Sequence, residues 1–478
     1  SITQGHENNP LQNIDVRDIQ NVTVLKDAVA TAIYGTKAAN GVIIINTNHA
    51  KDYATKIDFS ATTGINITPK NIPVMDSYNY RSYLNDILST TTLSGINISN
   101  MPFNNDNTNY INYNVYHNET NWQNEIFKSS IDKNYYLKVT GGDNIAKYAL
   151  SVGYANDNGI IDNTKQDKYT ARFNGDLNLS KKLTAQTNIS VGYGQQNLKD
   201  QSLTSKTNPI FLALTKAPFL NTNEVTSEGL ISPNYADSDY FGFSNPMQII
   251  HNGINSKKSY RFLGGVNFDY ALTNNIKISN ITGVTYDKAQ ENFFVPQKGI
   301  AQDTVNNSVV TSRLGAQVAR YFSIYNDLKV NYNKVLNNGH KINTFVGVRY
   351  HHNDAEQDYA LGFNSATDEL VSIGNSSLAL RTFGGNIGKW ANITTYGLVD
   401  YSISDKYIIN GSFSIDGSSR FGSKAKGGVI LSNKAFGVFP AIGGAWILSS
   451  ENFLREIENI NLLKYRISYG LTGNDDIG

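Results

Sequence analysis

Apolar and polar residues alternate with a period of two along most of this chain of 478 residues. Residues 168–179 show the pattern, with one face made of Tyr169, Ala171, Phe173, Gly175, Leu177 and Leu179 and the other of Lys168, Thr170, Arg172, Asn174, Asp176 and Asn178. Because successive side chains of a β-strand point to opposite faces, this alternation predicts a strand with one apolar face. We expect about thirteen such strands. They lie near 57–67, 134–142, 146–155, 167–179, 183–194, 259–272, 276–287, 319–333, 341–352, 393–404, 406–417, 436–448 and 462–472.

The connections between these strands alternate in length. Short ones are expected at 143–144, 180–182, 273–275, 334–340 and 405, and long ones at 68–133, 156–166, 195–258, 288–318, 353–392 and 418–435. Tight turns at one end and large loops at the other are typical of an outer-membrane β-barrel. A soluble β-sandwich has the same period of two, but it has no reason for this alternation of loop lengths or for such long strands.

Composition narrows the classes of function. The 41 basic residues nearly balance the 40 acidic ones, so no charge pattern points to nucleic acid as a partner. Cysteine is absent, which excludes disulfides and thiolate metal sites. The longest clean apolar run, Val42 to Ile45, is far shorter than the roughly 20 residues of a membrane helix. The first nine residues are polar and do not resemble a signal peptide, so we expect an interior section of a longer protein.

The segment 15–47 departs from the alternating pattern. It reads as a strand, a short helix, a glycine turn and a second strand. Asp27 is placed to cap the helix, Gly35 to end it in a left-handed conformation, and Asn40-Gly41 to turn the chain into the apolar run.

The sequence motifs VLKDA, ATAIYG and ANGVI of this segment resemble the end of the plug domain in TonB-dependent outer-membrane transporters, especially the SusC/RagA-like branch. Later segments resemble barrel strands of the same branch, among them NYYLKVTGG at 134–142, KYALSVGYANDNGII at 147–161 and FPAIGGAW at 439–446. The resemblance covers nearly the whole chain in the family's order. The motif residues that it singles out are Asp27, Ala28, Tyr34, Gly35, Asn40 and Gly41.

The resemblance implies an all-β membrane protein, an antiparallel transmembrane β-barrel with the remnant of an α+β plug domain. Residues 1–50 would be the C-terminal part of the plug, and residues 51–478 the N-terminal part of a barrel that has twenty-two strands in the family. It implies TonB-dependent active import of a large nutrient, an oligosaccharide or a peptide, across the outer membrane of a Gram-negative bacterium. The implied partners are a SusD-like surface lipoprotein acting as a lid, the TonB-ExbB-ExbD energy-transducing complex and outer-membrane lipid, with no nucleic acid, cofactor or enzymatic step.

Two alternatives from other classes stay open. One is a passive outer-membrane barrel or adhesin, in which the plug motif would be incidental. The other is a soluble all-β carbohydrate-processing protein.

Aromatic residues in the long loops are the candidate substrate-binding residues. They are Tyr78, Tyr80, Tyr116 and Trp122 in the first long loop and Tyr235 and Tyr240 in the third. Flat aromatic faces suit sugars or peptide side chains, but packing of the loops against one another explains the same residues and is favoured. A second aromatic group near strand ends, Tyr148, Tyr154, Tyr169, Tyr260, Tyr270 and Tyr407, fits an interfacial girdle.

Other chemistry is weakly indicated. His351 and His352 precede Asp354, Glu356 and Asp358, but adjacent histidines in a strand point to opposite faces and we expect the acids in a loop, so no metal site is predicted. The stretch GSSRFGSK at 417–424 has its Ser and Lys in the wrong order for a phosphate-binding loop. No catalytic grouping has a recognisable spacing.

Overall fold

The structure is a computed structural model. It describes residues 11, 14–50, 53–90, 98–202, 206–336, 339–421, 428–431, 434–454 and 459–475.

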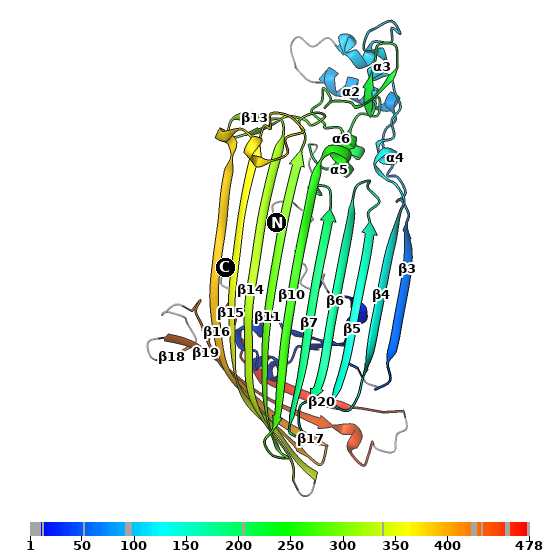
Figure 1. Cartoon of the computed structure of the whole chain (residues 1–478). Coiled ribbons are helices and arrows are strands. Elements are labelled where there is room, and N and C mark those ends of the chain that lie inside the picture. The colour runs from blue at the N-terminus through cyan, green and yellow to red at the C-terminus, as the bar shows by residue number, and fades with distance from the viewer. Residues whose placement is uncertain are drawn as a thin grey trace.

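A single antiparallel sheet of fourteen strands dominates the molecule (Figure 1), in the order β18-β19-β17-β16-β15-β14-β11-β10-β7-β6-β5-β4-β3, with β20 also paired to β19. Its first seven strands along the chain are β3 (Lys56–Asn66), β4 (Ser130–Gly142), β5 (Ala146–Asn158), β6 (Lys165–Asn178), β7 (Leu183–Asn197), β10 (Ile254–Ala271) and β11 (Ile276–Val295). The others are β14 (Arg313–Val335), β15 (His340–Phe363), β16 (Thr382–Ile403), β17 (Tyr407–Ser418), β18 (Gly428–Leu431), β19 (Lys434–Ile447) and β20 (Lys464–Gly470). Every strand predicted for the barrel is present in this sheet, and β18 is an additional strand of the same sheet.

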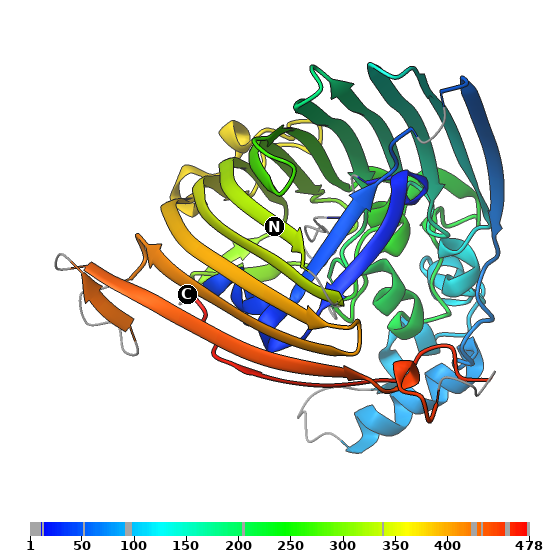
Figure 2. The same ribbon diagram turned by 90° about the horizontal axis from the view of Figure 1, so that it is seen from below.

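The sheet curves into an open arc (Figure 2). Two short strands from the start of the chain, β1 (Ile19–Leu25) and β2 (Val42–Thr47), lie on its concave side. The apolar side chains predicted for one face are largely exposed on the convex side, as for Val152 (50% exposed) and Val191 (48% exposed). Polar side chains such as Arg172, Asn174 and Ser190 are buried on the concave side. This arrangement reverses that of a soluble protein, and it matches a barrel wall whose outer face meets lipid.

Inside the arc lies a small module that the sequence predicted. It consists of η1 (Val16–Asp18), β1 (Ile19–Leu25), α1 (Ala28–Ala32), η2 (Gly35–Ala38) and β2 (Val42–Thr47). The two strands pair antiparallel in a sheet of their own. We call residues 15–50 the inner segment.

The long loops at one end of the sheet carry most of the remaining helices (Figure 1). The elements there are α2 (Ser77–Thr90), η3 (Ile98–Asn100), η4 (Pro102–Asn104), α3 (Tyr113–Tyr116), α4 (Trp122–Ile126), α5 (Pro209–Thr215), β8 (Asn223–Val225), β9 (Ile231–Tyr235) and α6 (Pro246–Asn252). The loops at this end also contain the short elements β12 (Asp303–Val305), β13 (Ser308–Val310), η6 (Ile373–Asn375) and η7 (Leu378–Leu380), whereas η8 (Leu448–Ser450) lies at the opposite end of the sheet. Among the described residues, no helix combines the length and apolar character needed to cross a membrane.

Several strands are longer than the sequence pattern predicts. β15 continues to Phe363 and β16 begins at Thr382, so much of the loop expected at 353–392 is strand. β11 and β14 also extend into the loop expected at 288–318. Apolar alternation fades in these extensions, but each backbone still pairs with a neighbouring strand, as between Arg313 and Phe363. Pairing across the sheet therefore lengthens the strands where the local pattern ends.

Candidate functional site: the inner segment and the outer loops

The helix of the inner segment begins as predicted. The Asp27 side chain accepts a hydrogen bond from the Ala30 backbone N–H at 3.0 Å, which caps α1. Val29 and Ala32 are buried, and Ala28 packs beside them against Ala441 of β19. The short helix therefore packs against the barrel wall through small side chains.

Glycines shape the end of this helix. Gly35 has φ +60°, the left-handed conformation that the sequence predicted. The turn brings the Thr36 N–H within 2.6 Å of the carboxylate of Asp416, a buried residue of β17. Gly41, with φ +93°, follows Asn40 and leads the chain into β2.

A first polar anchor holds the beginning of the inner segment to β4, β5 and β6. The Asp18 carboxylate, only 4% exposed, accepts hydrogen bonds from the Tyr136 hydroxyl at 2.7 Å and the Ser151 hydroxyl at 2.6 Å. The Arg172 guanidinium lies 3.5 Å away and is itself buried. Three strands of the wall thus converge on one carboxylate.

A second polar anchor holds α1 and η2 to the opposite part of the wall. The Ser412 hydroxyl donates to the Val29 carbonyl oxygen at 2.8 Å. Arg349 of β15 donates to the Ile33 carbonyl oxygen at 3.2 Å, and its guanidinium lies 5.0 Å from the centre of the Tyr34 ring. Arg349 also pairs with Asp327 of β14 at 3.0 Å, so the arginine is itself oriented by the wall.

Sequence reasoning missed the wall residues of both anchors. The available signal was a charged residue on the polar face of a strand, as the alternation already showed for Arg172. The pattern places such a residue on the concave side, but it does not say what the residue binds there.

The loop aromatics separate into two groups. Trp122 is buried in a cluster with Phe103, Ile126 and Phe219, and Tyr80, Tyr116 and Tyr235 pack against that cluster. Tyr78 and Tyr240 are 79% and 74% exposed. Four of the six candidates therefore have a packing role in the loops, and the other two are exposed.

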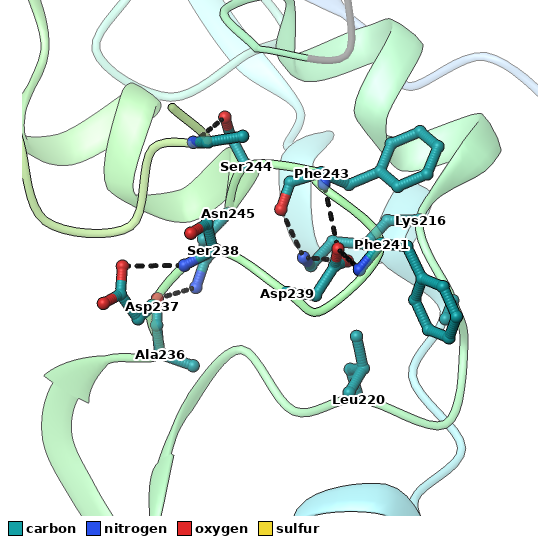
Figure 3. Close-up of polar contacts among 12 residues, drawn as sticks. Lys216, Leu220, Ala236, Asp237, Ser238, Asp239, Phe241, Phe243, Ser244 and Asn245 are labelled. Atoms are coloured by element: carbon teal, nitrogen blue, oxygen red, sulfur yellow. Dashed lines mark hydrogen bonds and ion pairs between the residues drawn. The ribbon is translucent and has the colours of Figure 1, made fainter. Parts of the chain in front are cut away.

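A buried ion pair fixes this loop cluster (Figure 3). The Lys216 ammonium lies 2.7 Å from the Asp239 carboxylate, with both side chains at most 4% exposed. Asp239 also accepts from the backbone N–H groups of Phe241 and Phe243, at 3.0 and 2.9 Å. Burial lowers the pKa of Lys216, and Asp239 opposes this effect. The loops are thus a packed structure with its own core.

The metal hypothesis gains no support. In the described part of the chain no three His, Asp or Glu side chains are grouped as metal ligands. His351 contacts the Ser323 hydroxyl at 2.8 Å, and His352 lies 3.6 Å from Asp354 on the same strand. The acids expected in a loop belong to β15. Residues 422–424 of the stretch 417–424 lie outside the described residues.

These features define a class of protein: a section of outer-membrane-type β-barrel wall with an inner segment held in its concavity. No protein-family model matches the chain. The chain is 26% identical over 488 residues to the TonB-dependent receptor P39 of Formosa agariphila, covering 100% of this chain and 42% of the relative. It is 24% identical over 491 residues to the TonB-dependent receptor SusC of Bacteroides thetaiotaomicron, covering 98% of this chain and 44% of SusC. The chain thus spans less than half the length of these curated relatives.

Solved structures agree on the fold. The RagAB peptide transporter matches with a TM-score of 0.77 and 19% identity, over 96% of this chain and 52% of the matched one. The same importer in its 'open-open' state matches with a TM-score of 0.75. The resemblance to SusC- and RagA-like TonB-dependent receptors, and the barrel fold that it implied, are therefore confirmed. The relatives are receptors and transporters and not enzymes.

Proposed function

We propose that this chain is the plug-to-barrel section of an active importer in the outer membrane of a Gram-negative bacterium. Residues 1–50 would form the rear of the plug and residues 51–478 the leading part of the barrel. The two open sheet edges, β3 on one side and β18 with β20 on the other, would be closed by further strands of a longer chain, since unpaired edges are not stable in lipid.

The polar contact between the inner segment and the wall carries this proposal. An interface that never opens gains most from apolar burial, whereas this one has only a small apolar contact at Ala441 and otherwise rests on Asp18, Asp416 and Arg349 and on backbone groups. Water can replace such contacts one at a time, each at a net loss of about 0.5–3 kcal/mol. A pulling force on the plug could therefore release the segment without unfolding the wall.

Energy coupling would come from the TonB-ExbB-ExbD complex, and a SusD-like lipoprotein would cover the outer loops as a lid. The cargo would be an oligosaccharide or a peptide. Tyr78 and Tyr240 are exposed enough to contact cargo or lid, while Tyr80, Tyr116, Trp122 and Tyr235 would support the loops that present them.

Uptake by cells that make the full-length protein tests the proposal. Candidate peptides and oligosaccharides are offered with and without a protonophore. Active import predicts saturable uptake that the protonophore abolishes. Deleting the region from Asp27 to Gly41 should change outer-membrane permeability.

A passive barrel or adhesin predicts the opposite results. Uptake would then be linear in cargo concentration and insensitive to the protonophore, and the deletion would leave permeability unchanged. A soluble carbohydrate-processing protein would need no detergent for purification.

A further inference from the structure

Five tyrosines form a continuous row across the convex face of β4, β5, β6, β7 and β10. They are cross-strand neighbours, in the order Tyr135, Tyr154, Tyr169, Tyr193 and Tyr260. Successive ring centres lie 6.3, 4.8, 6.0 and 5.0 Å apart. Three of these residues were predicted as girdle tyrosines, and Tyr135 and Tyr193 complete the row.

Chemical character changes sharply across this row. The next outward-facing row away from the loops is apolar, and consists of Leu137, Val152, Ala171, Val191 and Phe262. The next row toward the loops is polar, and consists of Lys133, Asn156, Asp167, Gln195 and Lys258. Tyrosine prefers the boundary between hydrocarbon and headgroups, so the row marks the level where the hydrocarbon ends on this part of the wall.

A pocket of about 610 Å³ lies one further row toward the loops. Asn158, Lys165 and Asn197 line it, and each lies four residues along its strand from a tyrosine of the row, on the same face. Four residues at about 3.3 Å each, along a strand tilted by about 40°, place the pocket about 10 Å above the tyrosines. The headgroup layer is roughly 5–7 Å thick on each side, so the pocket lies just above its outer edge, where a large headgroup can reach it.

The pocket lining carries more basic than acidic side chains. Lys128, Lys165 and Lys199 line it together with His251 at the end of α6. Lys199 is only 8% exposed, and its ammonium donates to the Gly253 carbonyl oxygen at 2.9 Å, a neutral partner that leaves its charge in place.

The balance of charge around the pocket favours an anion. Lys128 pairs with Asp162 at 2.9 Å and Lys165 with Asp167 at 3.2 Å. The lining itself contains three lysines and one aspartate, Asp162, and a further carboxylate, that of Asp132, is bound by the Asn158 backbone N–H at 2.7 Å. A phosphate would therefore meet a net positive surface whose ammonium groups act as hydrogen-bond donors.

We propose that this pocket binds the phosphate group of an anionic lipid in the outer leaflet. The acyl chains would lie along the apolar rows below the tyrosines, and the headgroup would reach up into the pocket. The inference rests on the proposed membrane location, but it does not depend on transport.

Native mass spectrometry of the full-length protein in detergent tests this proposal. The probes are lipid A, phosphatidylglycerol, zwitterionic phosphatidylethanolamine and inorganic phosphate. The double variant Lys128→Gln/Lys165→Gln removes two exposed pocket charges. Its matched control, Lys181→Gln/Lys182→Gln, removes two exposed lysines from the turn between β6 and β7, at the other end of these strands.

We expect the wild-type protein to retain lipid A or phosphatidylglycerol more tightly than phosphatidylethanolamine. Each lysine should contribute about fivefold, so the pocket variant should bind about 25-fold more weakly and the control less than twofold. Equal weakening in both variants would overturn the proposal. Displacement of the lipid by an equal concentration of inorganic phosphate would also overturn it, because the site would then recognise the free anion. Failure of active import would leave the ratio between these variants unchanged, so the two proposals fail separately.

Discussion

Replacing Asp18 with Asn is the most direct test of how the inner segment is held. The substitution keeps the shape of the side chain but removes its charge, and it leaves the Arg172 guanidinium buried without a carboxylate. An amide oxygen in place of Asp18 Oδ1 can still accept from the Tyr136 and Ser151 hydroxyls, and the amide NH2 group then faces Arg172. Both hydroxyls now donate to the same carboxylate oxygen.

The expected magnitude follows from these contacts. Removing one partner of a buried ion pair costs about 3–5 kcal/mol. The 3.5 Å distance between Arg172 and Asp18 is long for a direct ion pair, and Asn retains part of the hydrogen bonding, so we expect a value of about 3 kcal/mol. A change of that size raises the population of the released segment by about a hundredfold.

Hydrogen exchange of the full-length protein in detergent measures this release. Amides of β1 and β2 should exchange about a hundredfold faster in Asp18→Asn, while those of β4 to β6 should keep their protection. Asp15→Asn is the matched control. Its carboxylate pairs with Arg17 of the same segment at 2.7 Å, so its loss should change exchange by less than about tenfold. The reasoning would be refuted by unchanged exchange in Asp18→Asn, or by equal acceleration in the two variants.

Three further predictions concern the outer loops and the end of the helix. Asp239→Asn leaves the buried Lys216 ammonium without its carboxylate and should destabilise the loop cluster by about 3 kcal/mol, measured as faster proteolysis. The control Glu224→Gln breaks an exposed ion pair of the same loops and should change stability by less than about 1 kcal/mol. Burial holds the pKa of Lys216 below its ordinary value, so the folded loops favour the neutral amine. Their stability is therefore greatest above the unfolded pKa of about 10.4, and it falls as pH falls through the folded pKa. The Asp239→Asn loops should become more resistant to proteolysis between pH 7 and pH 10, and a flat pH profile would contradict this. Gly35→Ala places a Cβ in a left-handed backbone conformation, where it clashes with the Asp416 carboxylate. We expect the docking of the inner segment on the wall to weaken by about 2–4 kcal/mol. Hydrogen-exchange rates in β2 equal to those of the wild type would disprove this.

Local chemistry explains why the strands and the inner segment could be predicted from sequence. The alternation in 168–179 places Arg172 and Asn174 on one face wherever the strand lies, because the two faces of a strand follow from backbone geometry alone. Asp27 caps its helix through a group three residues away, and Gly35 ends it through its own φ angle. Such features depend on neighbours along the chain, and the structure has them as predicted.

Strand ends and loop packing depended on the neighbouring chain. β15 continues well past His352 because β14 and β16 supply hydrogen-bond partners along its whole length. Trp122 is buried because α5 packs over it, although its surroundings in the sequence resemble those of exposed Tyr78. Burial of an aromatic side chain in a long loop is decided by distant segments, and a local pattern carries no information about them.

The sequence by itself determined the alternating strands, the direction in which their two faces point, and the strand–helix–turn–strand order of the inner segment. The tertiary structure alone decided which charges meet across the concavity. Thr36 and Asp416 are 380 residues apart, and Asp18 meets Tyr136 across 118 residues. Those pairings are fixed by the curvature of the sheet and by the position of the inner segment within it. Curvature and position arise from the packing of all the strands together, so no local stretch of sequence encodes them.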